Sequence, residues 1–86
     1  MRWYVYIVEC SDGTYYCGST SSPSRRIAEH NSGKGAKYTR GRTPVKLLEA
    51  VRFPSRGEAL RVEAATKKQK KEKKVDFLKS KGFIDT

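Results

Sequence analysis

The sequence WYVYIVECSDGTYYCG occupies residues 3–18 and carries the clearest structural signal in the chain. Residues 3–8 are all aromatic or β-branched, a pattern typical of a central strand that is covered on both faces. A second β-rich run occupies residues 14–18, and the Asp-Gly pair at 12–13 lies between the two runs. This arrangement predicts a β-hairpin.

Two turns fit this hairpin, and they orient its tyrosines differently. A two-residue loop at 12–13 would put Tyr6 and Tyr16 on opposite faces of the sheet. A three-residue loop at 11–13, with Gly13 in the left-handed conformation, would put both tyrosines on one face. The residues of the turn leave both arrangements open.

Turn signals divide the next part of the chain into a helix, a loop and a third strand. The Ser-Pro pair at 22–23 predicts a helix with a hydroxyl N-cap, which runs to about Asn31 and ends at Gly33. Residues 32–44 combine glycine, basic side chains and one aromatic residue without periodicity, which indicates an ordered basic loop. Residues 45–53 predict the third strand.

The last third of the chain predicts helix. Residues 55–58 have the spacing of a capping box, and the helix that follows is expected to bury Leu60 and Ala64. Glu63 then lies on or beside the apolar face, where a carboxylate needs a partner. The lysine-rich run at 67–74 either continues this helix or bends into a second one.

The order β-β-α-β-α-α predicts an α+β fold, with a small three-stranded, mostly antiparallel sheet and helices packed against it. We expect residues 1–86 to form a single domain, with the functional motifs in 3–63 and a lysine-rich helical part in 64–86. The residues expected in the core come from all of these elements: Trp3, Val5, Ile7, Leu47, Phe53 and Leu60.

The charge of the chain indicates its partner. Its 86 residues include 19 Lys and Arg against 9 Asp and Glu, a formal net charge of +10. Such an excess attracts polyanions, and nucleic acid is the commonest of these inside cells. We therefore expect a protein that binds nucleic acid.

Other features argue against a membrane or secreted protein. No stretch approaches the ~18 apolar residues of a membrane span, and the apolar run at 3–8 is too short and aromatic for a signal peptide. Cys10 and Cys17 are too few for a disulfide framework, and with His30 as the only histidine they fall short of a zinc site. We expect free thiols and a cytoplasmic location.

The chain offers candidates for each requirement of phosphodiester hydrolysis. The reaction needs a base for water, a ligand for a divalent ion, a cation near the phosphate and a surface that holds the backbone. Tyr6 and Tyr16 could supply the base, Glu63 the ligand and Arg26 the cation. One carboxylate with water and substrate oxygens is a reasonable Mg²⁺ site, because this ion dehydrates reluctantly.

Residues 3–63 resemble the GIY-YIG nuclease domain, most closely its short stand-alone bacterial members, which are grouped as an uncharacterised protein family. Tyr-Val-Tyr at 4–6 stands where the family has Gly-Ile-Tyr, and Tyr-Cys-Gly at 16–18 stands where it has Tyr-Ile-Gly. The stretch at 32–42 is similar to the signature of the stand-alone subgroup.

The resemblance implies an endonuclease that hydrolyses phosphodiester bonds in DNA with one Mg²⁺ or Mn²⁺ ion, and it gives each residue a role. Tyr6 is the general base, assisted by Tyr16, so the two should share a face and the three-residue hairpin loop is favoured. Arg26 stabilises the scissile phosphate, and His30, four residues later on the same helix face, orients the substrate or relays a proton. Glu63 holds the metal. A phenol has a pKa of about 10, so Tyr6 would need Arg26 and the metal to stabilise its phenolate.

We further expect a monomer whose basic loop contacts nucleic acid, and whose activity is either weakly specific or directed to its target by a protein partner. The loop residues expected to bind by charge and stacking are Lys34, Lys37, Tyr38, Arg40 and Arg42.

An alternative is a basic nucleic-acid-binding module with weak or no catalysis. Tyr4 replaces the glycine of the first motif, and residues 64–86 lack the asparagine that many family nucleases have there. Glu63 also has a purely structural interpretation, an ion pair with Arg61 or Lys67.

Overall fold

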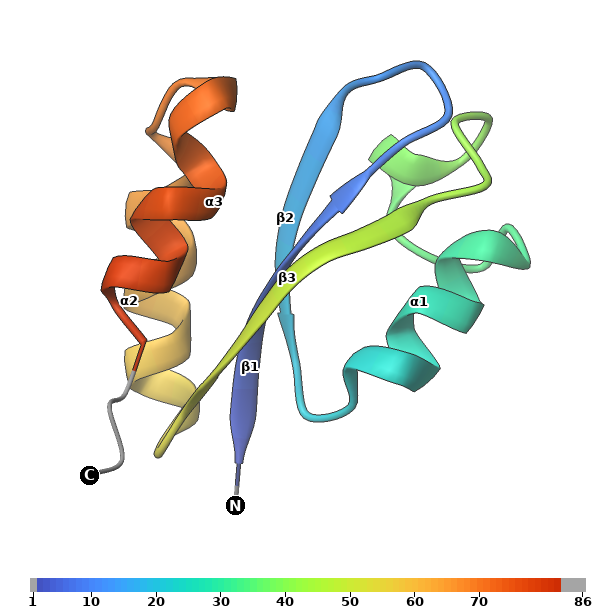
Figure 1. The fold of residues 1–86 in the computed structure, drawn as a ribbon. Coiled ribbons are helices and arrows are strands. Elements are labelled where there is room, and N and C mark those ends of the chain that lie inside the picture. The colour runs from blue at the N-terminus through green and yellow to red at the C-terminus, as the bar shows by residue number, and fades with distance from the viewer. Residues whose placement is uncertain (1, 83–86) are drawn as a thin grey trace.

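The computed structural model describes residues 2–82 (Figure 1). Three antiparallel strands form one sheet in the order β2-β1-β3. The elements along the chain are β1 (Trp3–Glu9), β2 (Tyr15–Thr20), α1 (Pro23–Asn31), the short 3-10 helix η1 (Lys37–Thr39), β3 (Lys46–Phe53), α2 (Arg56–Lys67) and α3 (Lys71–Ser80). The predicted α+β fold and its order of elements are confirmed.

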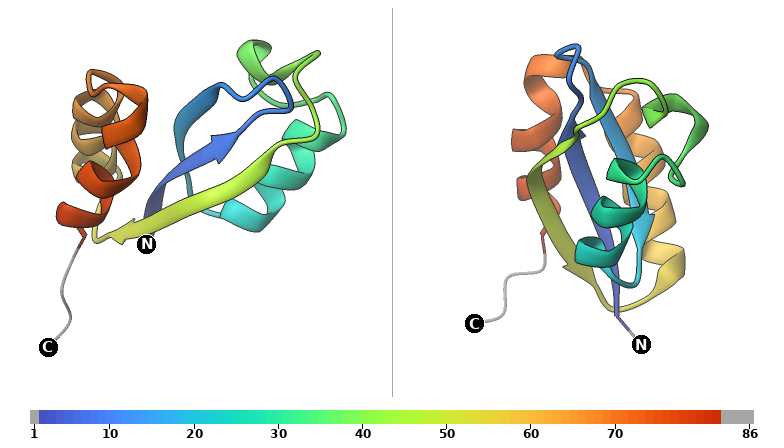
Figure 2. Two further views of the ribbon diagram at one scale, coloured as in Figure 1. Left: turned by 45° about the horizontal axis from the view of Figure 1, so that its top comes forward. Right: turned by 90° about the vertical axis from the view of Figure 1, so that its right-hand side faces the viewer.

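The helices lie on opposite sides of the sheet. Helix α1 and η1 cover one face, and α2 and α3 cover the other (Figures 1 and 2). Strand β1 lies between the two other strands and is buried on both faces, as its sequence predicts. The core towards α2 and α3 contains Val5, Ile7, Cys17, Phe53, Ala59 and Leu78. The core towards α1 contains Tyr6, Val8, Cys10 and Val45.

The β1–β2 hairpin closes with the three-residue loop. The backbone N–H of Cys10 donates to the carbonyl of Thr14 at 2.7 Å, and the N–H of Gly13 donates to the carbonyl of Cys10 at 2.9 Å. Gly13 has a φ of +84°, which glycine adopts without steric cost. As a result, Tyr6 and Tyr16 pack in the same core, and the expected register is confirmed.

The two cysteines lie on opposite faces of the sheet. Cys10 is buried towards α1, and Cys17 is buried towards α2 and α3. Both are free thiols, as expected.

The prediction that Leu47 is a core residue is wrong. Its side chain is 43% exposed, because the register of β3 against β1 shifts between Ile7 and Val8. This irregularity adds one residue to β3, so that Leu48 packs against the α2–α3 core in place of Leu47.

The prediction that Leu60 and Ala64 mark the buried stripe of α2 is also wrong. Leu60 is 44% exposed, and Ala64 is exposed as well. The helix instead turns Ala59, Val62 and Thr66 towards the sheet, and the small side chain of Ala59 lets it approach closely. Residue 63 follows Ala59 by one helical turn, so Glu63 still lies at the edge of the buried face.

The helix ends differ in how they are capped. Ser55 Oγ accepts the backbone N–H of Glu58 at 3.2 Å, which confirms the predicted capping interaction. Ser22 is the N-cap of α1, but its hydroxyl makes no cap hydrogen bond. The expected hydroxyl cap is therefore absent, and the Ser22 N–H instead donates to Thr20 Oγ1 at 3.1 Å.

The lysine-rich run bends into a second helix. Helix α2 ends at Lys67 and α3 begins at Lys71. Lys74 Nζ donates to the carbonyls of Thr66 and Lys67 at 3.2 and 3.0 Å, and so places a positive charge at the C-terminus of α2. The last four residues of the predicted helical part, 83–86, lie outside the described residues.

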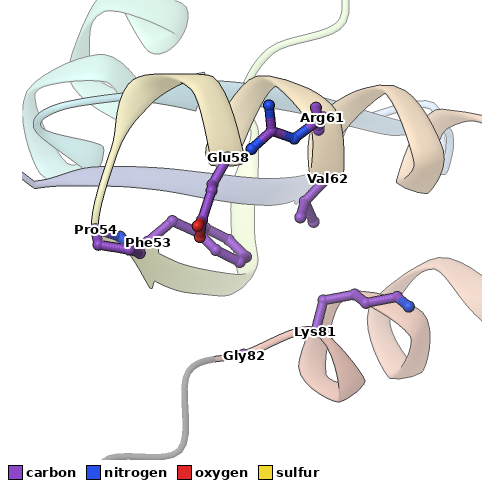
Figure 3. A pocket seen from close by; sticks show the side chains of 7 residues that line it. All are labelled: Phe53, Pro54, Glu58, Arg61, Val62, Lys81 and Gly82. Atoms are coloured by element: carbon purple, nitrogen blue, oxygen red, sulfur yellow. The ribbon is translucent and has the colours of Figure 1, made fainter.

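A cavity of about 610 Å³ lies where α2 begins and α3 ends (Figure 3). Its walls are formed by Phe53, Pro54, Glu58, Arg61, Val62, Lys81 and Gly82.

Within residues 2–82, none of the helices has the length and apolar character that crossing a membrane requires.

Candidate active site

Tyr6 of the first motif packs on the glycine of the second. Strand pairing places Tyr6 opposite Gly18, and the Tyr6 side chain is buried. A Cβ at position 18 would lie 2.6 Å from the Tyr6 hydroxyl oxygen, closer than non-bonded atoms approach. Gly18 is therefore needed for the position of Tyr6. Tyr4, which replaces the glycine of the first motif, is half-buried in β1 and leaves this contact intact.

We predict that Gly18→Ala destabilises the protein by about 1–3 kcal/mol, the usual cost of overpacking a core. Gly57→Ala is the matched control, because the nearest atoms to a Cβ there are 4.0 Å away and the position is helical. That variant should be neutral or slightly stabilising. Urea denaturation of both variants measures the difference. Equal stability of Gly18→Ala and the wild type would contradict the packing argument.

His30 is fully buried and connects Tyr6 to the basic loop. Tyr6 Oη lies 2.8 Å from His30 Nε2, and His30 Nδ1 lies 2.8 Å from Thr39 Oγ1. Thr39 Oγ1 in turn donates to the carbonyl oxygen of Ala36 at 2.8 Å. In the tautomer with the proton on Nδ1, Thr39 Oγ1 accepts from Nδ1–H and the lone pair of Nε2 accepts the Tyr6 O–H. In the other tautomer, Nδ1 accepts from the Thr39 hydroxyl and from the Ala36 N–H at 3.4 Å, and Nε2–H donates to Tyr6 Oη.

Two further residues hold the loop against His30. A Cβ at Gly35 would collide with the imidazole ring, so glycine lets the loop pack directly on it. Asn31 ties the two ends of the loop together, since its Oδ1 accepts the N–H of Val45 at 2.6 Å and its Nδ2 donates to the Val45 carbonyl at 3.3 Å. The sequence alone did not indicate a role for these residues or for Thr39, and the only signal is the glycine content of the loop.

Burial sets the protonation of this pair. Burial raises the pKa of Tyr6 to about 12, although the adjacent Arg26 lowers it. Burial also lowers the pKa of His30 from its ordinary value, and Arg26 adds to this effect. At neutral pH Tyr6 is therefore protonated and His30 is neutral. Arg26 lowers the pKa of Tyr6, as expected for stabilisation of its phenolate, but the opposite effect of burial on this pKa is larger.

Arg26 lies beside Tyr6 and is itself paired. Its Nη1 lies 3.0 Å from Glu29 Oε1, and Arg25 Nε lies 3.8 Å from Glu29 Oε2. Glu29 therefore neutralises part of the charge that a phosphate would meet at this position.

Glu63 reaches the same site around the edge of the sheet. Strand β2 is an edge strand that packs against α2, and its Tyr16 side chain belongs to the core towards α1, so side chains from both faces can meet at this edge. The Glu63 side chain is 16% exposed, and its Oε2 lies 2.8 Å from Lys67 Nζ. Lys67 Nζ is 6.0 Å from the centre of the Tyr16 ring. The ion pair considered as a structural role for Glu63 is present, and its partner is Lys67.

Aromatic rings cover the site on the loop side. The Tyr16 ring centre lies 5.5 Å from that of His30 and 5.8 Å from that of Tyr38, with Tyr16 and Tyr38 stacked at 23°. The Arg42 guanidinium lies 4.2 Å from the Tyr38 ring centre, and its Nε pairs with Asp12 Oδ2 at 3.0 Å. Tyr38 and Arg42 are thus engaged within the protein and hold the loop over Tyr16.

The remaining basic residues expected to bind nucleic acid are exposed: Lys34, Lys37 and Arg40. Of the predicted binding residues, Tyr38 and Arg42 make internal contacts although Tyr38 is also exposed, and the other three face solvent.

The structure brings the predicted catalytic residues together. Tyr6, Tyr16 and His30 contact one another, and Arg26 adjoins Tyr6. Glu63 is connected to them through Lys67, whose Nζ lies 2.8 Å from Glu63 Oε2 and 6.0 Å from the centre of the Tyr16 ring. Within residues 2–82 no three His, Cys, Asp or Glu side chains are grouped to hold a metal ion. Glu63 is the one carboxylate predicted as a ligand, and Glu29, which also adjoins the site, pairs with Arg25 and Arg26.

Comparison with known proteins agrees with the geometry. Residues 2–76 match the family described as the GIY-YIG catalytic domain. The chain is 49% identical over 76 residues to a UPF0213 protein from Cupriavidus pinatubonensis, covering 88% of this chain and 84% of that protein. It is 55% identical over 75 residues to a UPF0213 protein from Streptococcus pneumoniae, covering 87% and 76%.

Solved structures show the same fold. The solution structure of a UPF0213 protein from Bacillus halodurans is 50% identical, with a TM-score of 0.57 over 95% of this chain and 87% of that one. The solution structure of a protein from E. faecalis is 40% identical, with a TM-score of 0.66 over 100% and 95%. The chain therefore belongs to the UPF0213 family and carries a GIY-YIG catalytic domain.

Proposed function

We propose that the protein is a Mg²⁺-dependent endonuclease that hydrolyses phosphodiester bonds in DNA. The observation that carries this proposal is the hydrogen-bond chain from Tyr6 through His30 to Thr39. A buried, neutral histidine with its Nε2 at 2.8 Å from a tyrosine hydroxyl can take up a proton there in the tautomer that carries its own proton on Nδ1. Any buried tyrosine hydroxyl needs a hydrogen-bond partner, and a neutral histidine is a partner that can also take the proton.

In the proposed reaction His30 is the final proton acceptor. The proton of the attacking water passes to Tyr6 Oη as the Tyr6 proton passes to His30 Nε2, so Tyr6 never has to exist as a free phenolate. The water oxygen forms its bond to phosphorus while the bond to the leaving oxygen breaks. The leaving oxygen takes a proton from solvent, and His30 returns its proton to solvent by the reverse path.

Arg26 and Tyr16 position the reacting groups. The Arg26 guanidinium lies beside Tyr6, where it can bind the scissile phosphate and stabilise its developing charge once it exchanges Glu29 for that phosphate. Tyr16 packs against both Tyr6 and His30 and orients the water.

Glu63 fits a divalent ion that keeps most of its water. Its Oε2 bonds Lys67, while among the described residues no hydrogen bond or ion pair involves Oε1. A single carboxylate with water and substrate oxygens suits Mg²⁺, which when bound would polarise the phosphate. Cleavage of end-labelled single- and double-stranded DNA across a Mg²⁺ or Mn²⁺ titration tests the proposed function, with a chelator as the control.

The rate of cleavage should fall in acid. His30 must be neutral to accept a proton, and its pKa lies below the ordinary value of 6.5. The groups around it are Tyr6, Tyr16, Arg26 and Glu29. The rate should therefore be retained at pH 6.5 and lost as the pH falls through the lowered pKa. No alkaline loss is expected from Tyr6, whose pKa is about 12.

The free energy of unfolding should likewise decrease in acid. The unfolded chain binds a proton at His30 at a higher pH than the folded protein does, so the contribution of His30 to stability is complete above 6.5 and is lost as the pH falls through the folded pKa. The rate of cleavage measured from about pH 5 to pH 9 checks the predicted loss of activity in acid. If this loss has its midpoint at or above pH 6.5, the role of His30 is contradicted.

The exposed basic residues should carry binding to the phosphate backbone. We predict that affinity for DNA falls linearly in a log–log plot against salt, and that Arg40→Ala lowers the slope by about 0.9, the value for one phosphate contact. Arg42→Ala should instead lower stability, because Arg42 pairs with Asp12 and stacks on Tyr38. Fluorescence anisotropy at several salt concentrations measures the slope. A slope near zero for the wild type would remove nucleic acid as the partner.

A second candidate function is nucleic-acid binding without cleavage. It is favoured by the pairing of both charged catalytic candidates, Arg26 with Glu29 and Glu63 with Lys67. The divalent-ion titration separates the two candidates, because only the nuclease releases shorter fragments.

Buried thiols on opposite sides of the sheet suit a reducing compartment, and we propose the cytoplasm as the location for either function.

A further inference from the structure

The two side chains of the Glu63–Lys67 ion pair differ in their exposure to solvent. The Glu63 side chain is largely buried, whereas the Lys67 side chain is 50% exposed and lies in the last turn of α2. A carboxylate withdrawn from water needs a compensating charge at all times. A half-exposed ammonium on a four-carbon stem can rotate into water at little cost. The carboxylate is therefore fixed, and its partner is the mobile member of the pair.

Other lysines near the C-terminus of α2 are used differently. Lys74 Nζ makes two hydrogen bonds to the carbonyls that end α2. Lys71 Nζ lies 4.8 Å from the centre of the Tyr15 ring. Within residues 2–82, the ion pair of Glu63 is with Lys67.

We propose that Lys67 is a displaceable counter-ion that competes with the divalent cation for the Glu63 carboxylate. This inference rests on the proposed metal site at Glu63. In the metal-free protein Lys67 neutralises the carboxylate and keeps it compatible with burial. A divalent cation must displace Lys67, so the affinity of Glu63 for the ion is lower than that of an unpaired carboxylate.

The displaced ammonium stays in the site. Lys67 Nζ lies within 6.0 Å of the centre of the Tyr16 ring, and Tyr16 contacts Tyr6 and His30. A lysine released from Glu63 is therefore available to a phosphate beside the two tyrosines. The Lys67 ammonium pairs with Glu63 in the protein without metal, and it binds the phosphate of the substrate when the divalent cation occupies Glu63.

The test measures metal binding without nucleic acid, so that it does not depend on cleavage. Mn²⁺ is titrated into the wild type and the Lys67→Met, Lys68→Met and Glu63→Gln variants by isothermal calorimetry. Lys68→Met removes the same charge from the neighbouring exposed position, at which no ion pair to Glu63 is formed in the described part of the chain. Lys67→Met should bind Mn²⁺ about three- to tenfold more tightly than the wild type, in line with the loss of one competing ion pair. Lys68→Met should stay within about twofold.

A second readout confirms that the variants are folded and that the effect arises at the carboxylate. Without metal, Lys67→Met should melt at a lower temperature than Lys68→Met, because Glu63 loses its partner, and saturating Mn²⁺ should raise its melting temperature by more. Equal Mn²⁺ affinity of Lys67→Met and Lys68→Met, with binding lost in Glu63→Gln, would overturn the inference and leave the metal site standing. Absence of Mn²⁺ binding in every variant would overturn both.

Discussion

Glu63→Gln is expected to lower the rate of metal-dependent DNA cleavage by at least about a thousandfold, because removal of the metal ligand takes away several kcal/mol of transition-state stabilisation. Glutamine keeps the shape of the side chain but loses the charge that a divalent ion needs. Affinity for DNA should change little, since the exposed residues of the basic loop lie on a different element. Initial rates and anisotropy on the same preparation measure both properties.

Glu58→Gln is the matched control for this variant. Glu58 lies on the same helix, but it is exposed and lines the cavity at the other end of α2 (Figure 3). Its substitution should leave cleavage unchanged. Glu63→Gln also breaks the ion pair with Lys67 and should cost about 0.3–1 kcal/mol of stability. Full cleavage by a less stable Glu63→Gln variant would show that the carboxylate has only a structural role.

His30→Gln is expected to lower cleavage by about a hundred- to ten-thousandfold, the range for loss of a general base. Tyr6 loses the acceptor for its proton, and its own pKa of about 12 makes it a poor base alone. The variant should also lose about 1–3 kcal/mol of stability, because buried partners of His30 are left without good hydrogen bonds. Single-turnover cleavage and urea denaturation separate the two effects.

A double variant tests whether Tyr6 and His30 act as one unit. Tyr6→Phe removes the hydroxyl through which His30 would act, so Tyr6→Phe with His30→Gln should lose no more activity than the more damaging single variant. Losses that multiply in the double variant would contradict the relay from water through Tyr6 to His30.

The fold follows from local patterns where those patterns are strong. The six aromatic and β-branched residues of β1 and the glycine of the hairpin were sufficient to predict a central strand and a tight turn. The choice between two turn registers needed the family resemblance, because it depends on the packing of Tyr6 across Gly18, which the turn residues do not report. The exposure of Leu47 had no local signal either, since an irregularity between two strands decides it.

The sequence predicted which residues form the candidate site, but not the contacts that they make. Motif order indicated Tyr6, Tyr16, Arg26, His30 and Glu63. Tyr6, Tyr16 and His30 contact one another, Arg26 adjoins Tyr6, and Glu63 pairs with Lys67 near Tyr16. Thr39 is an unremarkable polar residue until the loop folds it against His30. Arg42 has the same charge as Arg40, and only the three-dimensional arrangement pairs one of them with Asp12. Contacts between residues distant in sequence determine these roles.

The most direct test of a nuclease at this site is fragment release by wild type and Glu63→Gln purified in parallel through the same steps. Labelled single- and double-stranded DNA is incubated with each protein over a full range of Mg²⁺ and Mn²⁺ concentrations, and fragments are counted after denaturing electrophoresis. We predict fragments that require the divalent ion and appear with the wild type but not with Glu63→Gln, which excludes a contaminating nuclease. A wild-type protein that binds the DNA but releases no fragments at any ion concentration, or equal release by both proteins, would contradict the proposed function.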